Sequence, residues 1–240
     1  MKQYASASYA ADRKYYQYFG YSTYNRNDIN SEILSKMINS KREFNINNID
    51  EIRIHVRARF HTVFLTKKAA NFKLSHGLDD YKYNKNFWQN TKFDYNNSTN
   101  IIPYGVSSKA MRDMFRHPDQ YTIGCRDAAI WTLKYGTYLA TGGTNLKLDD
   151  PVVDDSDWIP GENGFIENDN NIVKFLAYTQ YLGENIIYIG NNNFWGLATN
   201  KEKQINTMEG WFNVIKQWAW SGHPKLHKYR GRSQINVADL

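Results

Sequence analysis

The stretch that decides the fold is SSKAMRDMFRHPDQYTIGCRDAAIWTLKYGTYLAT, residues 107–141. Its first part places four apolar residues on one helical face, Ala110, Met111, Met114 and Phe115. Pro118 prevents that helix from continuing, so a break must follow it. A second helix is predicted from Cys125, because apolar residues recur at helical spacing until the glycine pair at 142–143. The stretch therefore predicts two helices, with a cysteine at the start of the second.

Cys125 is the only cysteine among 240 residues. A thiol in the first turn of a helix faces backbone N–H groups without partners and the positive end of the helix dipole. Both favour the thiolate, which is the form of cysteine that attacks carbonyl carbons. The alternative is a small apolar residue packed in the core. The residues alone leave both interpretations open.

Composition bounds the class of protein. The mass of 28.1 kDa allows a sizeable core in one domain, and a net charge of +6 is spread along the chain. A single cysteine excludes internal disulfides and cysteine-rich zinc sites. No window approaches 18 apolar residues, and the first residues lack the apolar run of a signal peptide. We expect a soluble chain that is made in the cytoplasm, without a membrane partner.

The remaining chain divides into three predicted parts. Residues 1–28 are polar and Tyr-rich and are predicted to form a loosely ordered arm, residues 29–222 a folded domain, and residues 223–240 an exposed basic tail. Within the domain we expect helices over about 31–38 and 49–68, with Asn30-Ser31 and Asn48 as caps. Residues 71–100 are predicted to be a long loop anchored by Phe87-Trp88.

The second half predicts strands. Residues 163–167 follow a turn that includes Glu162, and Ile186–Ile189 with Phe194-Trp195 form a hairpin around Asn191 and Asn192. A last helix begins after the cap at 206–207. The fold class is α+β, with antiparallel strands following the cysteine helix. This is the layout of papain-like thiol enzymes, in which the helix carries the nucleophile and the strands carry its base.

Three collinear segments resemble the Bacillus spore-coat transglutaminases, which are protein-glutamine gamma-glutamyltransferases. They are SSKAMRDMFRHPDQYTIGCRDAA at 107–129, PGENGFIEN at 160–168 and LGENIIYIGNNNFWGLA at 182–198. The resemblance implies a papain-like core of the NlpC/P60 type, with Cys125 as nucleophile and Glu184 as its carboxylate partner. It further implies a metal-independent enzyme without cofactors that joins protein Gln to protein Lys through a thioester. The setting it implies is a spore coat, or delivery as an effector.

Two positions depart from the family pattern. The residue before the nucleophile, a Glu in the family, is Gly124 here, and an ungapped match puts Leu197 where the family has a His. We therefore expect proton transfer to fall on Glu184, and a Glu introduced at position 124 to return a carboxylate beside the thiol. Phe194 and Trp195 either wall a channel for the aliphatic stem of lysine or belong to the core.

Two other functions fit the same residues. With water in place of the amine, the same fold would be a glutamine deamidase, for example a toxin or effector. The other class is a catalytically inactive relative, or a basic, aromatic-rich module that binds nucleic acid or an acidic surface. We do not expect nucleic acid as a partner, because the positive charge is not concentrated. The oligomeric state is left open.

Overall fold

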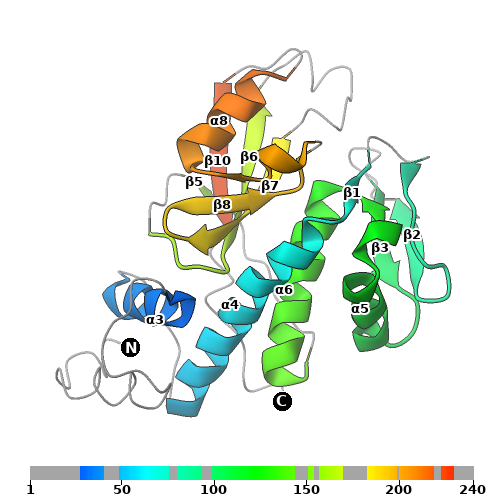
Figure 1. Ribbon diagram of the computed structural model, residues 1–240, viewed down its shortest axis with the longest axis horizontal. Coiled ribbons are helices and arrows are strands. Elements are labelled where there is room, and N and C mark those ends of the chain that lie inside the picture. The colour runs from blue at the N-terminus through cyan, green and yellow to red at the C-terminus, as the bar shows by residue number, and fades with distance from the viewer. Residues whose placement is uncertain are drawn as a thin grey trace.

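The computed structural model describes residues 28–40, 49–75, 80–92, 99–143, 151–153, 157–169, 183–198, 200–218 and 223–229. Within these residues a twisted sheet, covered on one face by a helix, lies beside a layer of longer helices (Figure 1). The predicted arm over residues 1–28, apart from its last residue, and the predicted cap at Asn48 lie outside the described part of the chain.

The main sheet is antiparallel throughout and has six strands in the order β5-β10-β6-β7-β8-β9. The strands are β5 (Pro151–Val153), β6 (Asn163–Asp169), β7 (Gly183–Gly190), β8 (Asn193–Gly196), β9 (Ile205–Asn206) and β10 (His223–Tyr229). The predicted hairpin is confirmed: β7 and β8 pair around Asn191 and Asn192, which both adopt positive φ angles. Asparagine tolerates this left-handed backbone better than most residues.

The predicted domain boundary at residue 222 is wrong. β10 lies inside the sheet between β5 and β6, with Leu226 opposite Ile166. The basic residues around this strand indicated an exposed tail, but backbone hydrogen bonds form a ladder regardless of side-chain charge. The folded domain therefore includes the strand to Tyr229.

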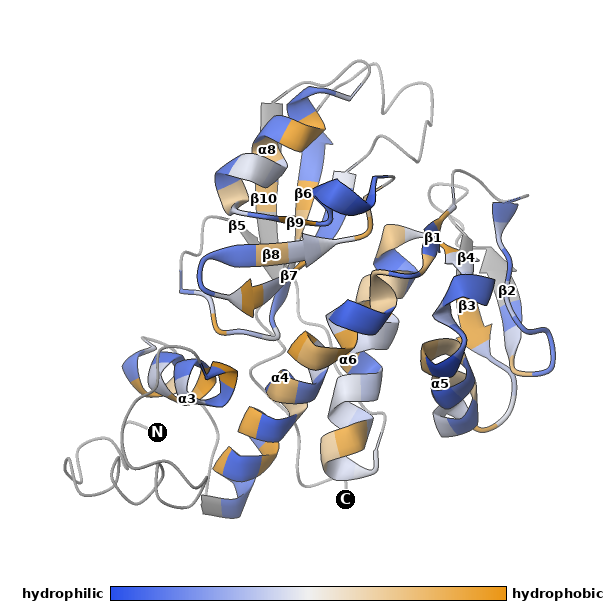
Figure 2. Ribbon diagram, in the orientation of Figure 1, coloured by the Kyte–Doolittle hydropathy of each residue, from blue (hydrophilic) through white to orange (hydrophobic). Residues whose placement is uncertain are grey.

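The helices match the sequence predictions closely. They are α3 (Ile29–Asn39), α4 (Ile49–Ala69), α5 (Ser107–Arg116), α6 (Cys125–Thr141) and α8 (Met208–Lys216), with short 3₁₀ turns at η2 (Pro118–Gln120) and η4 (Lys201–Lys203). Figure 2 shows apolar and hydrophilic bands alternating along α4 and α8. None of the described helices is both long and apolar enough to cross a membrane.

Helix caps were predicted less accurately than helix bodies. Asp28 rather than Asn30-Ser31 caps α3, since its carboxylate accepts the Ser31 N–H at 2.9 Å. α5 follows Val106 without any side-chain cap. Thr207 caps α8 as predicted, because its hydroxyl accepts the Gly210 N–H.

The segment predicted as a long loop contains regular structure. It includes β1 (Lys73–Leu74), which pairs with β4 (Thr122–Ile123), and β2 (Trp88–Lys92), which pairs with β3 (Thr99–Pro103). Trp88 is the anchor, as predicted, and its ring meets Trp131 edge-on at 4.7 Å between centroids. The polar composition of this segment favoured a loop. The residues that pair with its strands lie later in the chain, so the pairing could not be seen within the segment.

The two faces of the hairpin β7–β8 belong to different cores. Ile187, Trp195 and Leu197 pack with α4 and α6, whereas Ile186, Tyr188 and Phe194 pack beneath α8 against Trp211. This alternation follows from the two-residue period of a strand. Neighbouring residues of one strand therefore face opposite layers of the molecule.

A buried ion pair joins α4 to the turn before β6. Arg59 Nη1 lies 3.4 Å from Glu162 Oε1, and both side chains are almost wholly enclosed. Glu162 Oε2 also accepts the Ile159 N–H at 3.0 Å, which closes the turn. Glu162 therefore has the structural, turn-forming position that the sequence indicated.

The closest helix contact occurs where α6 crosses α4. Gly136 faces Thr62 so tightly that a Cβ atom at position 136 would lie 2.8 Å from the Thr62 backbone nitrogen. Only a residue without a side chain permits this approach.

Gly136→Ala is expected to destabilise the protein by about 1–3 kcal/mol, because the added methyl group must push two packed helices apart. Chemical denaturation of both proteins measures the difference. Thr62→Ala serves as the control background: the backbone of residue 62 remains in the way, so the penalty of Gly136→Ala should persist there. Recovery in the double variant would show that the backbone contact is not limiting.

Candidate active site

Cys125 is the first residue of α6, directly after the N-cap Gly124. Two short strands hold this position: β4 pairs with β1, and Thr122 also exchanges two backbone hydrogen bonds of 2.9 Å with Lys82. The cysteine remains partly exposed. The backbone of the nucleophile candidate is therefore held by the strands before it and by α6 after it.

The side chain nearest the sulfur comes from the start of β7. Asn185 Nδ2 lies 3.5 Å from Cys125 Sγ, and the thiol points to the Gly183 carbonyl oxygen at 3.9 Å. The sequence prediction missed Asn185. The signal was present in Gly183-Glu184-Asn185, because strand alternation places Asn185 and Glu184 on opposite faces of the sheet.

Glu184 is buried, with 2% of its surface exposed. Its Oε1 accepts the Leu197 backbone N–H at 2.9 Å. Gly196 makes room for it on the α8 side of the sheet, where a Cβ at position 196 would lie 3.1 Å from Glu184 Cγ and 2.8 Å from the Trp211 ring. In the described part of the chain the carboxyl and the thiol influence each other through charge rather than through a direct hydrogen bond.

At Cys125 the effect of burial on the pKa of the thiol is larger than the opposite effect of the helix start. Desolvation, followed by the negative charge of Glu184, raises the pKa of the thiol to about 12. The side chain of Asn185 and the backbone N–H groups of Asn185 and Arg126 lower this pKa, but they do not compensate. The helix start favours the thiolate, as the sequence indicated, but burial opposes it at this site.

The pKa of the Glu184 carboxyl is shifted in the same direction as that of the thiol. Burial raises the pKa of its carboxyl to about 8, although the Leu197 and Asn185 N–H groups favour the ionised form. Near neutral pH the pair is therefore largely protonated, and the carboxyl loses its proton before the thiol does. A carboxylate with a pKa near the working pH is well matched to act as a general base.

The space beside the nucleophile at position 124 is already occupied. A Cβ atom there would lie 2.5 Å from the hydroxyl of Tyr81, which accepts the Gly124 N–H at 3.1 Å. A Glu at position 124 could therefore return a carboxylate beside the thiol only if the Tyr81 hydroxyl moved aside.

Leu197, at the family's histidine position, is fully buried in the helix-side core. Its side chain contributes packing, and its backbone N–H holds the Glu184 carboxyl. A leucine in place of the histidine that the resemblance implies therefore still holds the Glu184 carboxylate, through its backbone N–H.

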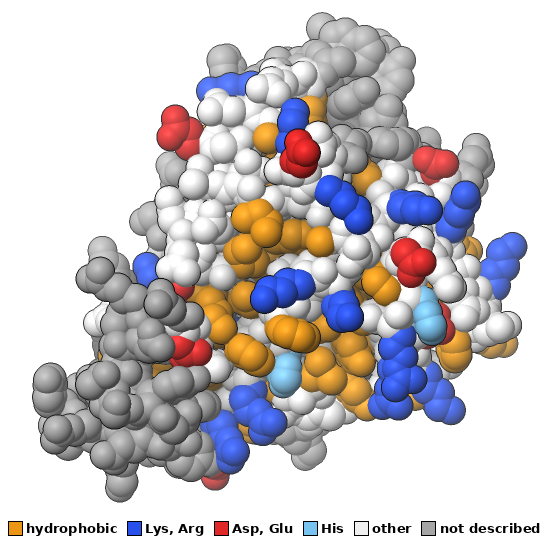
Figure 3. All heavy atoms as spheres, in the orientation of Figure 1, with side chains coloured by type: hydrophobic (Ala, Val, Ile, Leu, Met, Phe, Trp, Pro, Cys, Tyr) orange, Lys and Arg blue, Asp and Glu red, His pale blue; other side chains and the backbone are white. Residues whose placement is uncertain are grey.

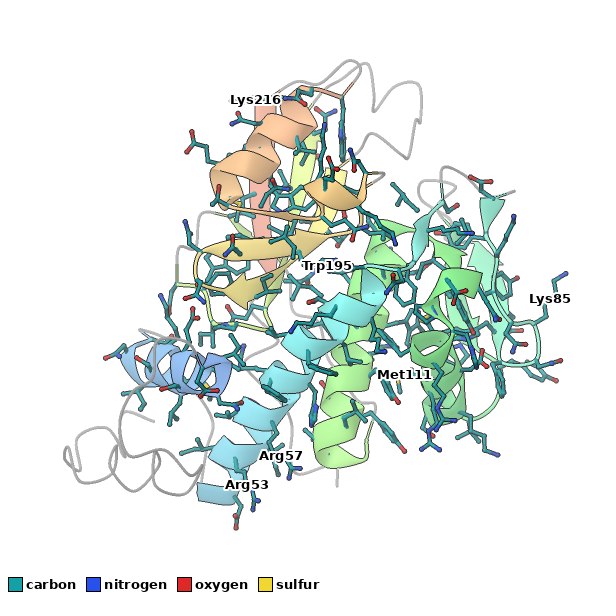
Figure 4. All side chains as sticks on the ribbon, viewed as in Figure 1. Arg53, Arg57, Lys85, Met111, Trp195 and Lys216 are labelled. Atoms are coloured by element: carbon teal, nitrogen blue, oxygen red, sulfur yellow. The ribbon has the colours of Figure 1, made fainter. Side chains whose placement is uncertain are left out.

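The structure separates Phe194 and Trp195. Phe194 packs beneath α8, where it meets Trp158 edge-on at 5.0 Å. Trp195 lies between β8 and the end of α4, and Met111 between α5 and α6 (Figure 4). Of the two predicted substrate contacts, only Trp195 shares the core against which Cys125 packs.

Trp195 also lines a groove of about 520 Å³ between α4 and strands β8 and β9. Apolar side chains of α4 form one wall, including Phe64, which is half exposed, and Ile205 contributes to the other. Figure 3 shows this band of hydrophobic side chains crossing the face, interrupted by basic groups. Lys67 and Lys201 are two of the basic residues that line it.

Groups of metal-ligating side chains do not form in the described residues: nowhere do three His, Cys, Asp or Glu residues gather. The groups around the Cys125 thiol are the Glu184 carboxyl, which can exchange a proton, and the Asn185 amide, which can donate a hydrogen bond.

Comparison with known proteins places the chain. The family described as protein-glutamine gamma-glutamyltransferase matches residues 10–147, which include Cys125 but end before Glu184. No curated protein sequence matches. A solved structure, the transglutaminase from Geobacillus stearothermophilus without its C-terminal extension, aligns with a TM-score of 0.59 and 16% identity. The alignment covers 80% of this chain and 96% of that chain.

The structural match shows the same mixed helix-and-strand fold, with the papain-like placement of a cysteine at a helix start that the sequence predicted. The family match covers more than half of the 240 residues. The chain belongs to the protein-glutamine gamma-glutamyltransferase family, whose members are cysteine-dependent acyltransferases acting on protein glutamine and lysine.

Proposed function

We propose that Cys125 is the nucleophile of this transglutaminase, that Glu184 is its proton acceptor and donor, and that Asn185 stabilises the sulfur. The observation that carries the proposal is the meeting of three groups from two elements. The start of α6 brings the thiol to the first residues of β7, where a buried carboxyl of raised pKa and an amide donor follow each other.

The first half-reaction transfers the glutamine acyl group to the sulfur. Ionised Glu184, which makes no direct hydrogen bond to Sγ, takes the proton of the thiol through a bridging water as Sγ attacks the carboxamide carbon, which avoids forming a thiolate in advance. The C–N bond then breaks, the proton passes to the leaving nitrogen, and ammonia departs from the thioester. Backbone N–H groups at the start of α6 are donors suited to the oxyanion.

The second half-reaction runs in the opposite sense. A lysine amine enters as the ammonium ion and loses one proton to solvent on approach. Glu184 takes the second proton as nitrogen attacks the thioester carbon. The C–S bond breaks and the sulfur regains its proton from the carboxyl. The groove beside Trp195, with its apolar α4 wall, is a candidate path for the lysine stem. Action in a spore coat, or as a delivered effector, stays a prediction.

Cys125→Ala is expected to abolish incorporation of a fluorescent primary amine into a glutamine-bearing protein while the circular dichroism spectrum stays unchanged. The physical reason is the loss of the only thiol. Ammonia release should be measured in parallel. Ammonia without amine incorporation, in the wild type at saturating amine, would identify a deamidase instead; full activity in Cys125→Ala would refute a thiol mechanism.

Glu184→Gln is expected to reduce turnover by about 10²–10⁴-fold, the usual effect of removing a general base. Gln keeps an acceptor for the Leu197 N–H, so the fold should persist. Wild-type turnover should rise with pH up to about 8, as the carboxyl ionises. A variant that retains near-wild-type turnover would rule out Glu184 as the base.

The same substitution changes stability with pH. The pKa of Glu184 is raised from 4.5 to about 8 on folding, so folding favours its protonated form. Its contribution to stability is greatest below pH 4.5 and is lost as pH rises through about 8. Denaturation curves should therefore show Glu184→Gln gaining stability relative to the wild type across this interval. A constant difference would contradict the raised pKa.

Titration of the Cys125 thiol should show that Glu184 and Asn185 shift its pKa in opposite directions. Glu184 raises the pKa of the thiol and Asn185 lowers it. The pH profile of iodoacetamide alkylation should therefore move to lower pH in Glu184→Gln and to higher pH in Asn185→Ala. Shifts in the same direction for both variants would show that the two side chains do not act on the sulfur as proposed.

A further inference from the structure

The start of α6 lacks a side-chain cap of its own. Its N-cap is Gly124, which has no side chain, and its third residue is Asp127, a carboxylate at the position that completes a capping box. In the usual box the acidic side chain reaches back to the N-cap N–H directly. Here Asp127 faces inward instead, with 2% of its surface exposed, and its Oδ2 accepts the Ile101 N–H at 3.3 Å.

Tyr81 bridges the two ends of this interrupted box. Its hydroxyl accepts the Gly124 N–H at 3.1 Å and forms a side-chain hydrogen bond with Asp127. A phenol has one proton to donate and lone pairs to accept with, so the hydroxyl donates to the carboxylate and accepts from the amide.

The position of Tyr81 is fixed from both sides. The next residue, Lys82, is bonded to Thr122 through two backbone hydrogen bonds of 2.9 Å, only two residues before Gly124. The ring packs against the same core as Cys125. The absent side chain at position 124 provides the remaining space, since a Cβ there would lie 2.5 Å from the hydroxyl oxygen but 3.7 Å from ring carbon Cζ.

We propose that Tyr81 is a positioning residue for catalysis, which caps the Cys125 helix from outside and so fixes the first-turn N–H groups and the sulfur for attack. The inference rests on the proposed role of Cys125 as nucleophile. Tyr81 acts through Gly124 and Asp127 rather than by touching the substrate.

The test compares steady-state kinetics of four proteins: wild type, Tyr81→Phe, Gly124→Ala and the double variant. Tyr81→Phe should lower kcat by about tenfold with KM for both substrates nearly unchanged, since one hydrogen bond that orders the transition state is lost. Gly124→Ala should lower kcat at least as much, because the new methyl group displaces the hydroxyl.

The double variant separates positioning from general damage. Without the hydroxyl, the nearest atom of residue 81 to the new methyl group is Cζ at 3.7 Å, so Gly124→Ala should cost nothing further in the Tyr81→Phe background. Independent, multiplying effects of the two substitutions would overturn the inference. Tyr83→Phe is the matched control, since Tyr83 packs against the same core and should leave kcat unchanged.

Amide hydrogen exchange at Gly124 reports the cap without requiring activity. Exchange should be faster in Tyr81→Phe than in the wild type and unaffected in Tyr83→Phe. Faster exchange with wild-type kcat would show that the cap exists but does not position the nucleophile, and the inference would fall.

A failure of the proposed crosslinking activity would give a different result from a failure of the proposed role of Tyr81. If the wild type incorporates no amine, that proposal falls, and the iodoacetamide alkylation rate of Cys125 in the same variants replaces kcat. A slower rate in Tyr81→Phe would still support the positioning role, and equal rates in wild type and Tyr81→Phe would overturn it.

Discussion

The packing of α4 against α6 is the constraint on which the rest of the structure depends. Gly136 lets the two helices approach until backbone meets side chain at Thr62. α4 also carries Arg59, whose buried pairing with Glu162 ties the helix layer to the turn before β6. The same arrangement brings the first residues of β7 to the start of α6. The site is therefore a consequence of how closely two helices and the start of one inner strand are held.

Enclosure has a chemical consequence at this junction. The helix start offers N–H donors to the sulfur, yet desolvation dominates and raises the pKa values of Cys125 to about 12 and Glu184 to about 8. A thiol and a carboxyl that both keep their protons are unreactive until the carboxyl ionises. Reactivity is then tied to proton transfer during attack.

The two departures from the family pattern are each accommodated by a neighbour. At position 124 a glycine makes room for the Tyr81 hydroxyl, and at position 197 a leucine supplies its backbone N–H to the Glu184 carboxyl. At 16% identity to the Geobacillus enzyme, the fold is kept while most residues are exchanged. Such exchange is expected where a site depends on the placement of backbone and charge rather than on one set of side chains.

The sequence by itself determined the local elements and the position of the nucleophile. Apolar periodicity set α4, α5 and α6, the paired asparagines set the β7–β8 hairpin, and the lone cysteine fell at a helix start. These features depend on residues close together in the chain. Only the tertiary structure decided that His223–Tyr229 lies inside the sheet, that Asn185 rather than Glu184 touches the sulfur, and that Tyr81 caps the nucleophile helix. It also decided that burial opposes the ionisation of the Cys125 thiol, which the helix start favours. Each of these depends on burial or on partners distant in sequence, and a local pattern carries neither.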